Sequence, residues 1–142
     1  MLSRVFTLND KSIGEVMVPK EKMTALNIDA SIEDILKIIL KTGYSRFPIT
    51  KGKGLDIEGI IHTKDFFRLI DAKKSLSIKK ILRPPYFIEA DKKIDAQLRS
   101  FQTKRLHQAI VLDNTGNVIG LVTLEDILEE LVGSIQDEHD MA

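Results

Sequence analysis

Apolar residues recur at helical spacing in two segments of this chain. In the first, between Ser31 and Gly43, they fall every three or four residues and predict an amphipathic helix. Ser31 is the expected N-cap of this helix and Gly43 its expected stop. The apolar residues are Ile32, Ile35, Leu36, Ile39 and Leu40. The same spacing near the C-terminus predicts a second helix, with the apolar stripe Leu124, Ile127, Leu128 and Leu131.

Short runs of β-branched and apolar residues predict strands around these helices. Residues 24–28 (TALNI) and 86–89 (YFIE) are two such runs. Two further pairs of runs are joined by segments that contain Gly, KGKGLD and DNTGN, which is typical of hairpin turns. These pairs are RFPIT with IEGII, and QAIVL with NVIGLV. We therefore expect two hairpins, each followed by a helix.

The order of these elements repeats because the sequence itself repeats. SIGEVMVP (12–19) matches SIKKILRP (77–84), and GIIHTKDFF (59–67) matches GLVTLEDIL (120–128). Residues 30–50 lie over residues 92–112 in the same way. Each copy reads β-α-β-β-α, so we predict an α/β fold.

Neither copy alone has enough apolar residues for a comfortable core. We expect the two copies to pack sheet to sheet as a pseudo-twofold pair. Repeat one is placed at residues 12–72 and repeat two at residues 77–135, with residues 1–11 and 136–142 as flanking segments.

Composition and charge exclude several classes of protein. The chain has 142 residues and no Cys, which rules out disulfides, thiolate metal sites and a cysteine nucleophile, and fits a cytoplasmic protein. No apolar stretch is long enough to span a bilayer. Seven acidic residues and no Lys or Arg follow residue 122, so the first 122 residues carry 21 basic and 14 acidic residues. These basic residues are scattered singly, which argues against a nucleic-acid surface.

Thr123 and Asp126 stand where a buried strand gives way to a helix, and two interpretations are open. The first is a cap, in which Thr123 accepts hydrogen bonds from the first turn and Asp126 holds the reciprocal position. The second is a nucleotide site, because helix N-termini bind phosphate and a carboxylate there can accept both hydroxyls of a ribose. A single T-x-x-D does not decide between them.

The repeats and their endings resemble the CBS-domain family, whose paired repeats form a Bateman module. The resemblance covers about residues 12–135 and rests on the repeat length and the G-h-h-T-x-x-D ending, where h is apolar. More narrowly, VMVPKEKM (16–23), GYSRFPI (43–49) and GLVTLEDILEELVGSIQDEHD (120–140) are similar to the CorC/HlyC-type (CNNM-like) membrane proteins.

That family is linked to magnesium and cobalt transport. Its CBS pair lies in the cytoplasm, between a transmembrane domain and a small C-terminal domain, and binds adenine nucleotide. The resemblance implies that this chain is the regulatory segment of a longer inner-membrane protein. A free-standing short protein is the alternative.

In such modules each cleft takes the T-x-x-D of one repeat together with the first segment and middle strand of the other. The resemblance therefore implies a first cleft that binds ATP, ADP or AMP through Asp126 (ribose hydroxyls), Thr123 (ribose or phosphate) and the backbone of Val18. Val18 stands where relatives usually have Thr. The rest of the cleft is expected from the middle strand, with the adenine against Tyr44 and Pro48 and the phosphate at Arg46. This run consists of Tyr44, Ser45, Arg46, Phe47 and Pro48.

Some of these residues have a plainer interpretation. Arg46 fits equally well as a solvated charge at a strand edge, and Tyr44 and Phe47 are more typical of core residues than of base contacts.

The second cleft is expected to be empty or weak. It combines His62 and Asp65 with Arg83 and Pro84 and with the segment His107–Ile110. Here His62 replaces the Thr and Ile110 replaces the Pro of the middle strand. A His fills more space at the helix entrance and is expected to cap it less well, so His62 is interpreted as a packed or partly exposed residue.

The acidic C-terminal residues point in different directions around a helix, so we expect no dedicated metal site. Mg²⁺ is expected only as an ion carried by the nucleotide. No nucleophile and base pair and no phosphate loop are present, so no enzymatic activity is expected. Two functions remain: a non-catalytic adenine-nucleotide sensor that controls an attached membrane transport domain, and a structural module whose role is dimerisation. A homodimer is expected in either case.

Overall fold

The computed structural model describes residues 10–72 and 77–141, with side chains described as far as Gly133. The chain divides into two compact units. Unit 1 comprises Met1–Met23 and Tyr86–Ala142, and unit 2 comprises Thr24–Pro85. Each unit contains one mixed sheet with helices packed on it, which confirms the predicted α/β class.

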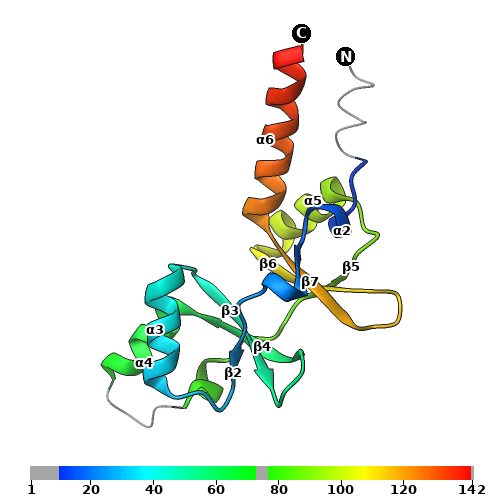
Figure 1. Ribbon diagram of the computed structural model, residues 1–142. Helices are drawn as coiled ribbons and strands as arrows, with labels where there is room; N and C mark the ends of the chain where they lie inside the picture. The colour runs from blue at the N-terminus through cyan, green and yellow to red at the C-terminus, as the bar shows by residue number, and fades with distance from the viewer. Residues whose placement is uncertain (1–9, 73–76, 142) are drawn as a thin grey trace. The chain divides into compact units, whose positions relative to one another are not determined.

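Unit 1 is built on a four-stranded sheet in the order β1-β7-β6-β5 (Figure 1). β6 and β7 form the predicted antiparallel hairpin, β5 lies parallel to β6, and β1 lies antiparallel to β7. The strands are β1 (Val18–Pro19), β5 (Phe87–Glu89), β6 (Gln108–Leu112) and β7 (Val118–Thr123). The helices are α2 (Ile13–Val16), the 3-10 helix η1 (Lys20–Lys22), α5 (Ile94–Lys104) and α6 (Leu124–Met141).

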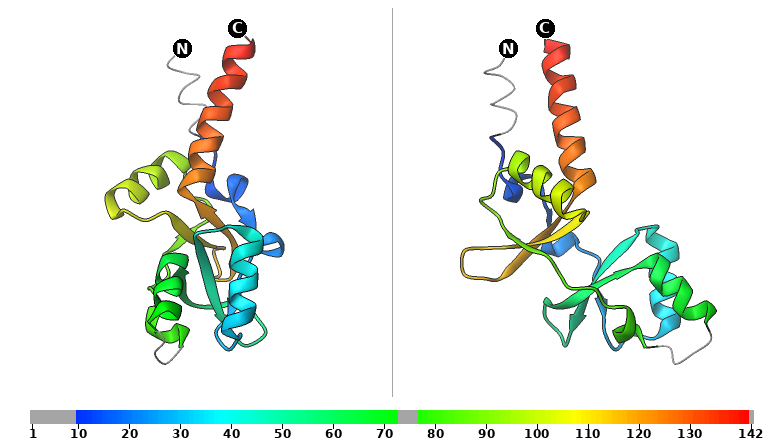
Figure 2. Two further views of the ribbon diagram at one scale, coloured as in Figure 1. Left: turned by 90° about the vertical axis from the view of Figure 1, so that its left-hand side faces the viewer. Right: turned by 180° about the vertical axis from the view of Figure 1, so that it is seen from behind.

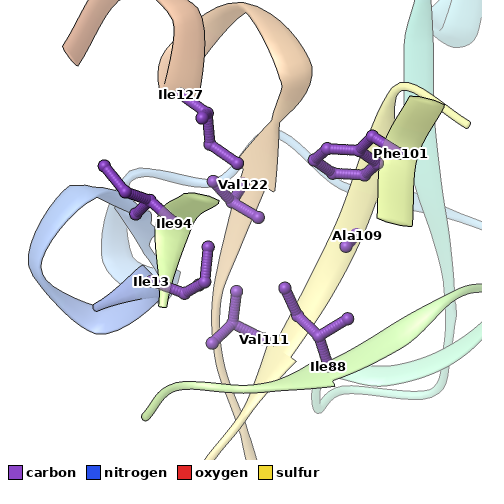
Figure 3. Close-up of a cluster of buried hydrophobic side chains, with 8 residues drawn as sticks. All are labelled: Ile13, Ile88, Ile94, Phe101, Ala109, Val111, Val122 and Ile127. Carbon is purple, nitrogen blue, oxygen red and sulfur yellow. The ribbon is translucent and has the colours of Figure 1, made fainter. Parts of the chain in front are cut away.

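The core of unit 1 lies between one face of this sheet and its helices. Figure 3 shows that side chains from α2, α5 and α6 meet those of the three longer strands. The buried residues are Ile13, Ile88, Ile94, Phe101, Ala109, Val111, Val122 and Ile127. Burial of this apolar surface is the main term that holds the helices on the sheet.

Unit 2 repeats the arrangement with a three-stranded sheet in the order β2-β3-β4. Its elements are β2 (Leu26–Asn27), α3 (Ile32–Thr42), β3 (Arg46–Lys51), β4 (Asp56–His62), α4 (Thr63–Asp71) and the 3-10 helix η2 (Ile78–Ile81). α3 and α4 lie side by side (Figures 1 and 2). The buried core residues of unit 2 are Leu26, Ile35, Ile39, Phe47, Ile49, Ile61, Phe66 and Ile78.

The predicted ends of the first long helix are confirmed. The Asp34 N–H donates to Ser31 Oγ at 3.1 Å, which is an N-cap hydrogen bond. Gly43 adopts a left-handed conformation with φ of 71°, and its N–H donates to the Ile39 carbonyl at 2.8 Å. Gly is favoured here because it has no Cβ to clash in that conformation.

Two residues of the predicted apolar stripes are exposed. Leu40 is 71% exposed and Leu128 is 43% exposed. A helical repeat of 3.6 residues lets a sheet cover only part of the apolar arc, and both residues lie at its edge. Leu40 and Leu128 belong to the predicted stripes by their spacing, but the packing of the helices leaves them exposed.

The leading segment of each repeat joins the sheet of the other repeat. Val18 in the first segment pairs with Leu121 in β7. In the same way Arg83, in the segment that leads into repeat two, forms an antiparallel bridge with Ile60 in β4. The compact units consequently do not coincide with the sequence repeats. This exchange is what brings residues of different repeats together inside one unit.

Glycines make room for these leading segments. A Cβ added to Gly120 would lie 2.6 Å from both Met17 Sδ and the Val18 carbonyl oxygen. A Cβ at the corresponding Gly59 would lie 2.8 Å from the Arg83 carbonyl oxygen. Both distances are shorter than van der Waals contact. The first residue of each G-h-h-T/H motif must therefore be Gly, because the backbone of the leading segment lies too close for a Cβ.

Gln97 is a polar residue inside the core of unit 1, and its replacement is expected to be tolerated. It is fully buried, its Oε1 has no hydrogen-bond donor among the described residues, and its Nε2 reaches Tyr86 Oη only at 3.4 Å. The corresponding residue of repeat one is the core residue Ile35. Because an unsatisfied buried acceptor is costly, Gln97→Met is expected to raise the free energy of unfolding by about 1 kcal/mol.

Urea unfolding of the purified chain measures this change. Gln102→Met, at an exposed position of the same helix, is the control and is expected to stay within about 0.5 kcal/mol of the parent chain. A loss of more than about 1 kcal/mol in Gln97→Met would show that the amide makes a stabilising interaction.

Candidate functional site

The N-terminus of α6 is closed by a reciprocal pair of hydrogen bonds. The Asp126 N–H donates to Thr123 Oγ1 at 3.0 Å, and the Thr123 N–H donates to Asp126 Oδ2 at 3.2 Å. This is a capping box, in which two backbone donors of the first turn are satisfied by side chains. The capping interpretation of the T-x-x-D is confirmed.

The cap leaves part of the Asp126 carboxylate unused. Only Oδ2 accepts the Thr123 N–H, and Oδ1 has no hydrogen-bond donor among the described side chains and backbone groups. Asp126 and Thr123 are both half-buried. An ionised carboxylate has about four acceptor sites, so one capping bond leaves room for two hydroxyl donors. Capping and ligand binding are therefore compatible at this helix.

Val18 lies next to this helix entrance in the same unit. Its strand β1 pairs with β7, and the end of β7 is Thr123. Val18 is half-buried and carries no hydroxyl. The structure thus places three of the predicted residues, Val18, Thr123 and Asp126, in unit 1.

In each repeat, the first residue of the second helix donates a backbone hydrogen bond to the residue that precedes the middle strand. The Leu124 N–H donates to the His107 carbonyl at 2.8 Å, and the Thr63 N–H donates to the Ser45 carbonyl at 2.9 Å. These two bonds occupy corresponding positions in the repeats. His107 is exposed, and its Nδ1 lies 3.7 Å from Glu125 Oε1.

The middle-strand run predicted to contact the ligand lies in unit 2. Tyr44 is 57% exposed, Ser45 is exposed and Arg46 is half-buried. Phe47 is fully buried in the unit 2 core, and Pro48 is buried beside it in β3. The ring of Phe47 packs in that core, so Phe47 offers a ligand its backbone only. Tyr44 is the member of the run with an exposed ring.

The helix entrance of repeat one has different chemistry. His62 caps α4 with its ring nitrogen, since the Lys64 N–H donates to Nδ1 at 3.1 Å. Asp65 does not form the reciprocal bond. Its Oδ2 instead accepts from Arg83 Nε at 3.0 Å and from Arg83 Nη2 at 2.8 Å. The structure therefore brings together His62, Asp65 and Arg83, and Asp65 has an internal cationic partner.

Stability is expected to depend on the protonation of His62. Its partial burial, followed by the charges of Arg46 and Arg83, lowers the pKa of His62 below its ordinary value of 6.5. Below pH 6.5, His62 is protonated in the unfolded chain but still neutral in the folded chain. The free energy of unfolding therefore falls as the pH drops, and it stops falling once the pH is below the pKa of His62 in the folded chain. Protonation also removes the Nδ1 lone pair that caps the helix.

His62→Asn keeps a capping acceptor that does not titrate. We expect this variant to lose less free energy of unfolding than the parent chain between about pH 7.5 and 5.5, by at most about 0.5 kcal/mol because the site is largely solvated. Chemical denaturation at several pH values measures it. His107→Asn is the matched control, and an equally flat profile in that variant would contradict the assignment to His62.

The described residues contain no group of three or more His, Asp or Glu side chains suited to a metal ion. Among the helices of the described chain, none combines the length and the apolar character needed to cross a bilayer.

The two sequence repeats match a known protein family. A family model described as the CBS domain matches the chain twice, at residues 13–72 and 78–133. The chain belongs to the CBS-domain family. The CBS pair is also similar to the protein named magnesium and cobalt efflux protein CorC of Escherichia coli K12, with 38% identity over 142 residues, 99% of this chain and 48% of the relative. This CBS pair thus spans about half the length of the curated relatives that it matches.

Solved structures of CBS pairs have the same fold. One is the CBS domain of a bacterial CNNM/CorC family Mg²⁺ transporter in complex with ATP, with a TM-score of 0.81 and 32% identity over 93% of this chain and 94% of that chain. Another is a CBS-domain pair with bound AMP from Klebsiella pneumoniae, with a TM-score of 0.77 and 26% identity over 87% of this chain and 99% of that chain. The resemblance drawn from the sequence motifs is confirmed.

Two features of the site were missed in the sequence. Arg83 was assigned to the second cleft, but its pairing with Asp65 was not foreseen. The required close approach at Gly59 and Gly120 was missed as well. A signal for the second feature was present, because Gly occurs at the same position of both repeats.

Proposed function

We propose that this chain is a non-catalytic regulatory module that binds an adenine nucleotide at the helix entrance formed by Thr123 and Asp126. The observation that carries this proposal is the Asp126 carboxylate, which is fixed by the cap through Oδ2 and keeps Oδ1 for a ligand. A ribose offers two adjacent hydroxyl donors that suit such a group. The ATP complex of a related CBS domain supports the choice of nucleotide.

The other residues have proposed roles that follow from their chemistry. Thr123 keeps a hydroxyl hydrogen for ribose or phosphate, because its oxygen accepts the capping bond. Within unit 2, the exposed ring of Tyr44 is proposed as a stacking surface for an adenine, with Pro48 beside it and Arg46 as a cation for phosphates, as the family resemblance implies. Val18 contributes backbone contacts only, since an isopropyl group forms no hydrogen bonds.

Magnesium enters this proposal with the nucleotide. A Mg²⁺ ion bound to the phosphates keeps several waters and needs few protein ligands. It also reduces the repulsion between the phosphates and acidic side chains of the first turn of α6, namely Glu125 and Asp126.

Isothermal titration with ATP and with AMP, each with and without Mg²⁺, tests the binding function. We expect one binding event per chain and unchanged nucleotide after incubation, because the module is proposed to be non-catalytic. Absence of both heat and a thermal shift at millimolar nucleotide would rule out the proposal, and release of phosphate from ATP would rule out the non-catalytic part.

The nucleotide is proposed to control a membrane transport domain in a longer protein. The similarity to CorC over 48% of that relative supports a parent protein with further domains. The family resemblance implies that these are a transmembrane domain and a C-terminal domain, with this module at the cytoplasmic face of the inner membrane. A ligand shifts a conformational equilibrium by its difference in affinity for the two states. Mg²⁺ flux through the parent protein that does not respond to nucleotide would contradict this role.

A second candidate function is a dimerisation module. Phe67 in α4 and Leu128 in α6 occupy corresponding positions of the repeats, and they are 45% and 43% exposed. Large apolar side chains exposed on both second helices favour burial against another copy of the chain. Sedimentation of Phe67→Glu and Leu128→Glu variants tests it. Dimers without nucleotide binding would favour this function alone, whereas dimers that bind nucleotide fit both.

A further inference from the structure

Arg83 occupies in unit 2 the position that Val18 occupies in unit 1. The Ile60 N–H donates to the Arg83 carbonyl at 2.9 Å, and the Arg83 N–H donates to the Ile60 carbonyl at 2.8 Å. Val18 pairs with Leu121 in the same antiparallel sense, and Leu121 is the residue of repeat two that corresponds to Ile60. The leading segments therefore present a guanidinium in one unit and an isopropyl group in the other at the same place.

The two corresponding carboxylates consequently have different partners. Asp65 Oδ2 accepts two charge-assisted hydrogen bonds from Arg83, at 3.0 and 2.8 Å, and its side chain is only 20% exposed. Asp126 accepts one backbone N–H and has no cationic partner among the described residues. Both carboxylates lie in the first turn of the helix that ends their repeat.

We infer that Arg83 is a built-in occupant of the Asp65 carboxylate, and that it limits this chain to a single ribose-binding carboxylate, Asp126. The inference rests on the proposed function, because it takes ribose binding as the role of the free carboxylate. Hydroxyl donors of a ribose and N–H donors of a guanidinium compete for the same acceptor. The guanidinium is charged and tethered next to its partner, and charge-assisted hydrogen bonds are about twice as strong as neutral ones. Arg83 fills Oδ2 of Asp65 with two such bonds and compensates its charge, so a neutral diol binds the remaining Oδ1 less favourably than it binds Asp126.

The ion pair can be removed without unfolding the chain. Arg83 is 58% exposed and Asp65 is 20% exposed, so water still reaches the carboxylate when Arg83 is replaced, and we expect only a small loss of stability. Arg83→Met keeps an unbranched apolar side chain and deletes the donors. Its expected effect is to release Asp65 while the backbone bridge to Ile60, which does not depend on the side chain, is retained.

The test uses the full chain with the substitution Asp126→Ala, which removes ribose binding at Asp126, and adenosine is the probe. Adenosine carries no phosphate, so loss of the Arg83 charge does not change an attraction for phosphate. NMR titration is expected to show that Asp126→Ala/Arg83→Met binds adenosine at least about fivefold more tightly than Asp126→Ala, the size set by an exposed ion pair. 2′,3′-Dideoxyadenosine, which lacks both hydroxyls, is expected to gain nothing.

Arg99→Met in the same Asp126→Ala background is the matched control. Arg99 forms an exposed ion pair with Asp95 in α5, with 3.7 Å between Nη2 and Oδ2. This variant is expected to bind adenosine no better than Asp126→Ala alone. His62→Thr in that background separates the cap from the ion pair, and a gain in adenosine affinity from His62→Thr without one from Arg83→Met would overturn the inference.

The other outcomes are also decisive. No gain in Arg83→Met, or an equal gain with dideoxyadenosine, overturns the inference and leaves nucleotide binding at Asp126 intact. Adenosine that binds Asp126→Ala/Arg83→Met but does not bind the parent chain supports the inference and contradicts the proposed function. If the double variant does not fold, Arg83→Met alone decides through its stoichiometry. Two adenosines per chain, against one for the wild-type chain, support the role of Arg83, and one per chain in both overturns it.

Discussion

Asp126→Ala is expected to weaken the binding of adenine nucleotide by about 100-fold, or about 3 kcal/mol. The variant removes the acceptor for two ribose hydroxyls, and each hydrogen bond to a charged group contributes about 1.5 to 3 kcal/mol. It also removes the bond from the Thr123 N–H, so a loss of about 1 kcal/mol in the free energy of unfolding is expected as well. Isothermal titration and urea unfolding measure the two effects separately.

Glu125→Ala is the matched control for this variant. It removes the same charge from the same helical turn, but the described contact of Glu125 is with His107, at 3.7 Å, and not with the cap. We expect nucleotide affinity within about threefold of the parent chain, because a screened exposed charge contributes little. A loss of stability in Asp126→Ala with unchanged affinity would mean that the carboxylate is a cap and nothing more.

Gly120→Ala is expected to lower the free energy of unfolding by about 1 to 3 kcal/mol. The added Cβ would lie 2.6 Å from the Val18 carbonyl oxygen and 2.6 Å from Met17 Sδ. The methionine side chain can move aside, but the carbonyl belongs to strand β1, so the leading segment itself must shift. Because that segment carries Val18, the affinity for nucleotide is expected to fall together with the stability.

Gly133→Ala is the control for the glycine variant. A Cβ at Gly133 meets no atom of the described residues within 4 Å, and Gly133 lies inside α6. Replacing Gly by Ala in a helix is expected to stabilise it by about 0.5 to 1 kcal/mol. Thermal unfolding of the two variants should therefore move in opposite directions. A neutral Gly120→Ala variant would contradict the close approach of the leading segment.

The sequence predicted the elements and their order well because local signals determine them. Hydrophobic periodicity located the long helices, Ser31 and Gly43 marked the ends of α3, and the duplication showed that both halves share one architecture. The exposed Leu40 and Leu128 were not foreseen, because periodicity gives the direction of an apolar stripe but not how much of it the sheet covers. Coverage depends on tertiary packing.

The exchange of leading segments was predicted only in part. The family resemblance implied that each cleft takes the first segment of the other repeat, but no residue pattern indicated the strand register. Pairing of Val18 with Leu121 and of Arg83 with Ile60 depends on contacts between residues far apart in the chain. Non-local pairing of this kind has no local sequence signal.

In the candidate site, too, local motifs were predicted correctly and contacts between distant residues were not. Thr123 and Asp126 were correctly placed at a helix start, because a capping box is a local motif. The partner of Asp65 was missed because Arg83 is distant in sequence and reaches it only through the β4 bridge. Burial of Phe47 was predicted by its apolar character, whereas its assignment to the ligand wall came from the family resemblance.

A crystal structure of this chain grown with excess ATP and Mg²⁺ tests the central claim most directly. The proposed function predicts the ribose hydroxyls within about 3.2 Å of the Asp126 carboxylate, with the bond between Thr123 and Asp126 preserved. Clear density for the helix entrance without nucleotide, with Asp126 Oδ1 bonded to another side chain of the protein, would contradict it.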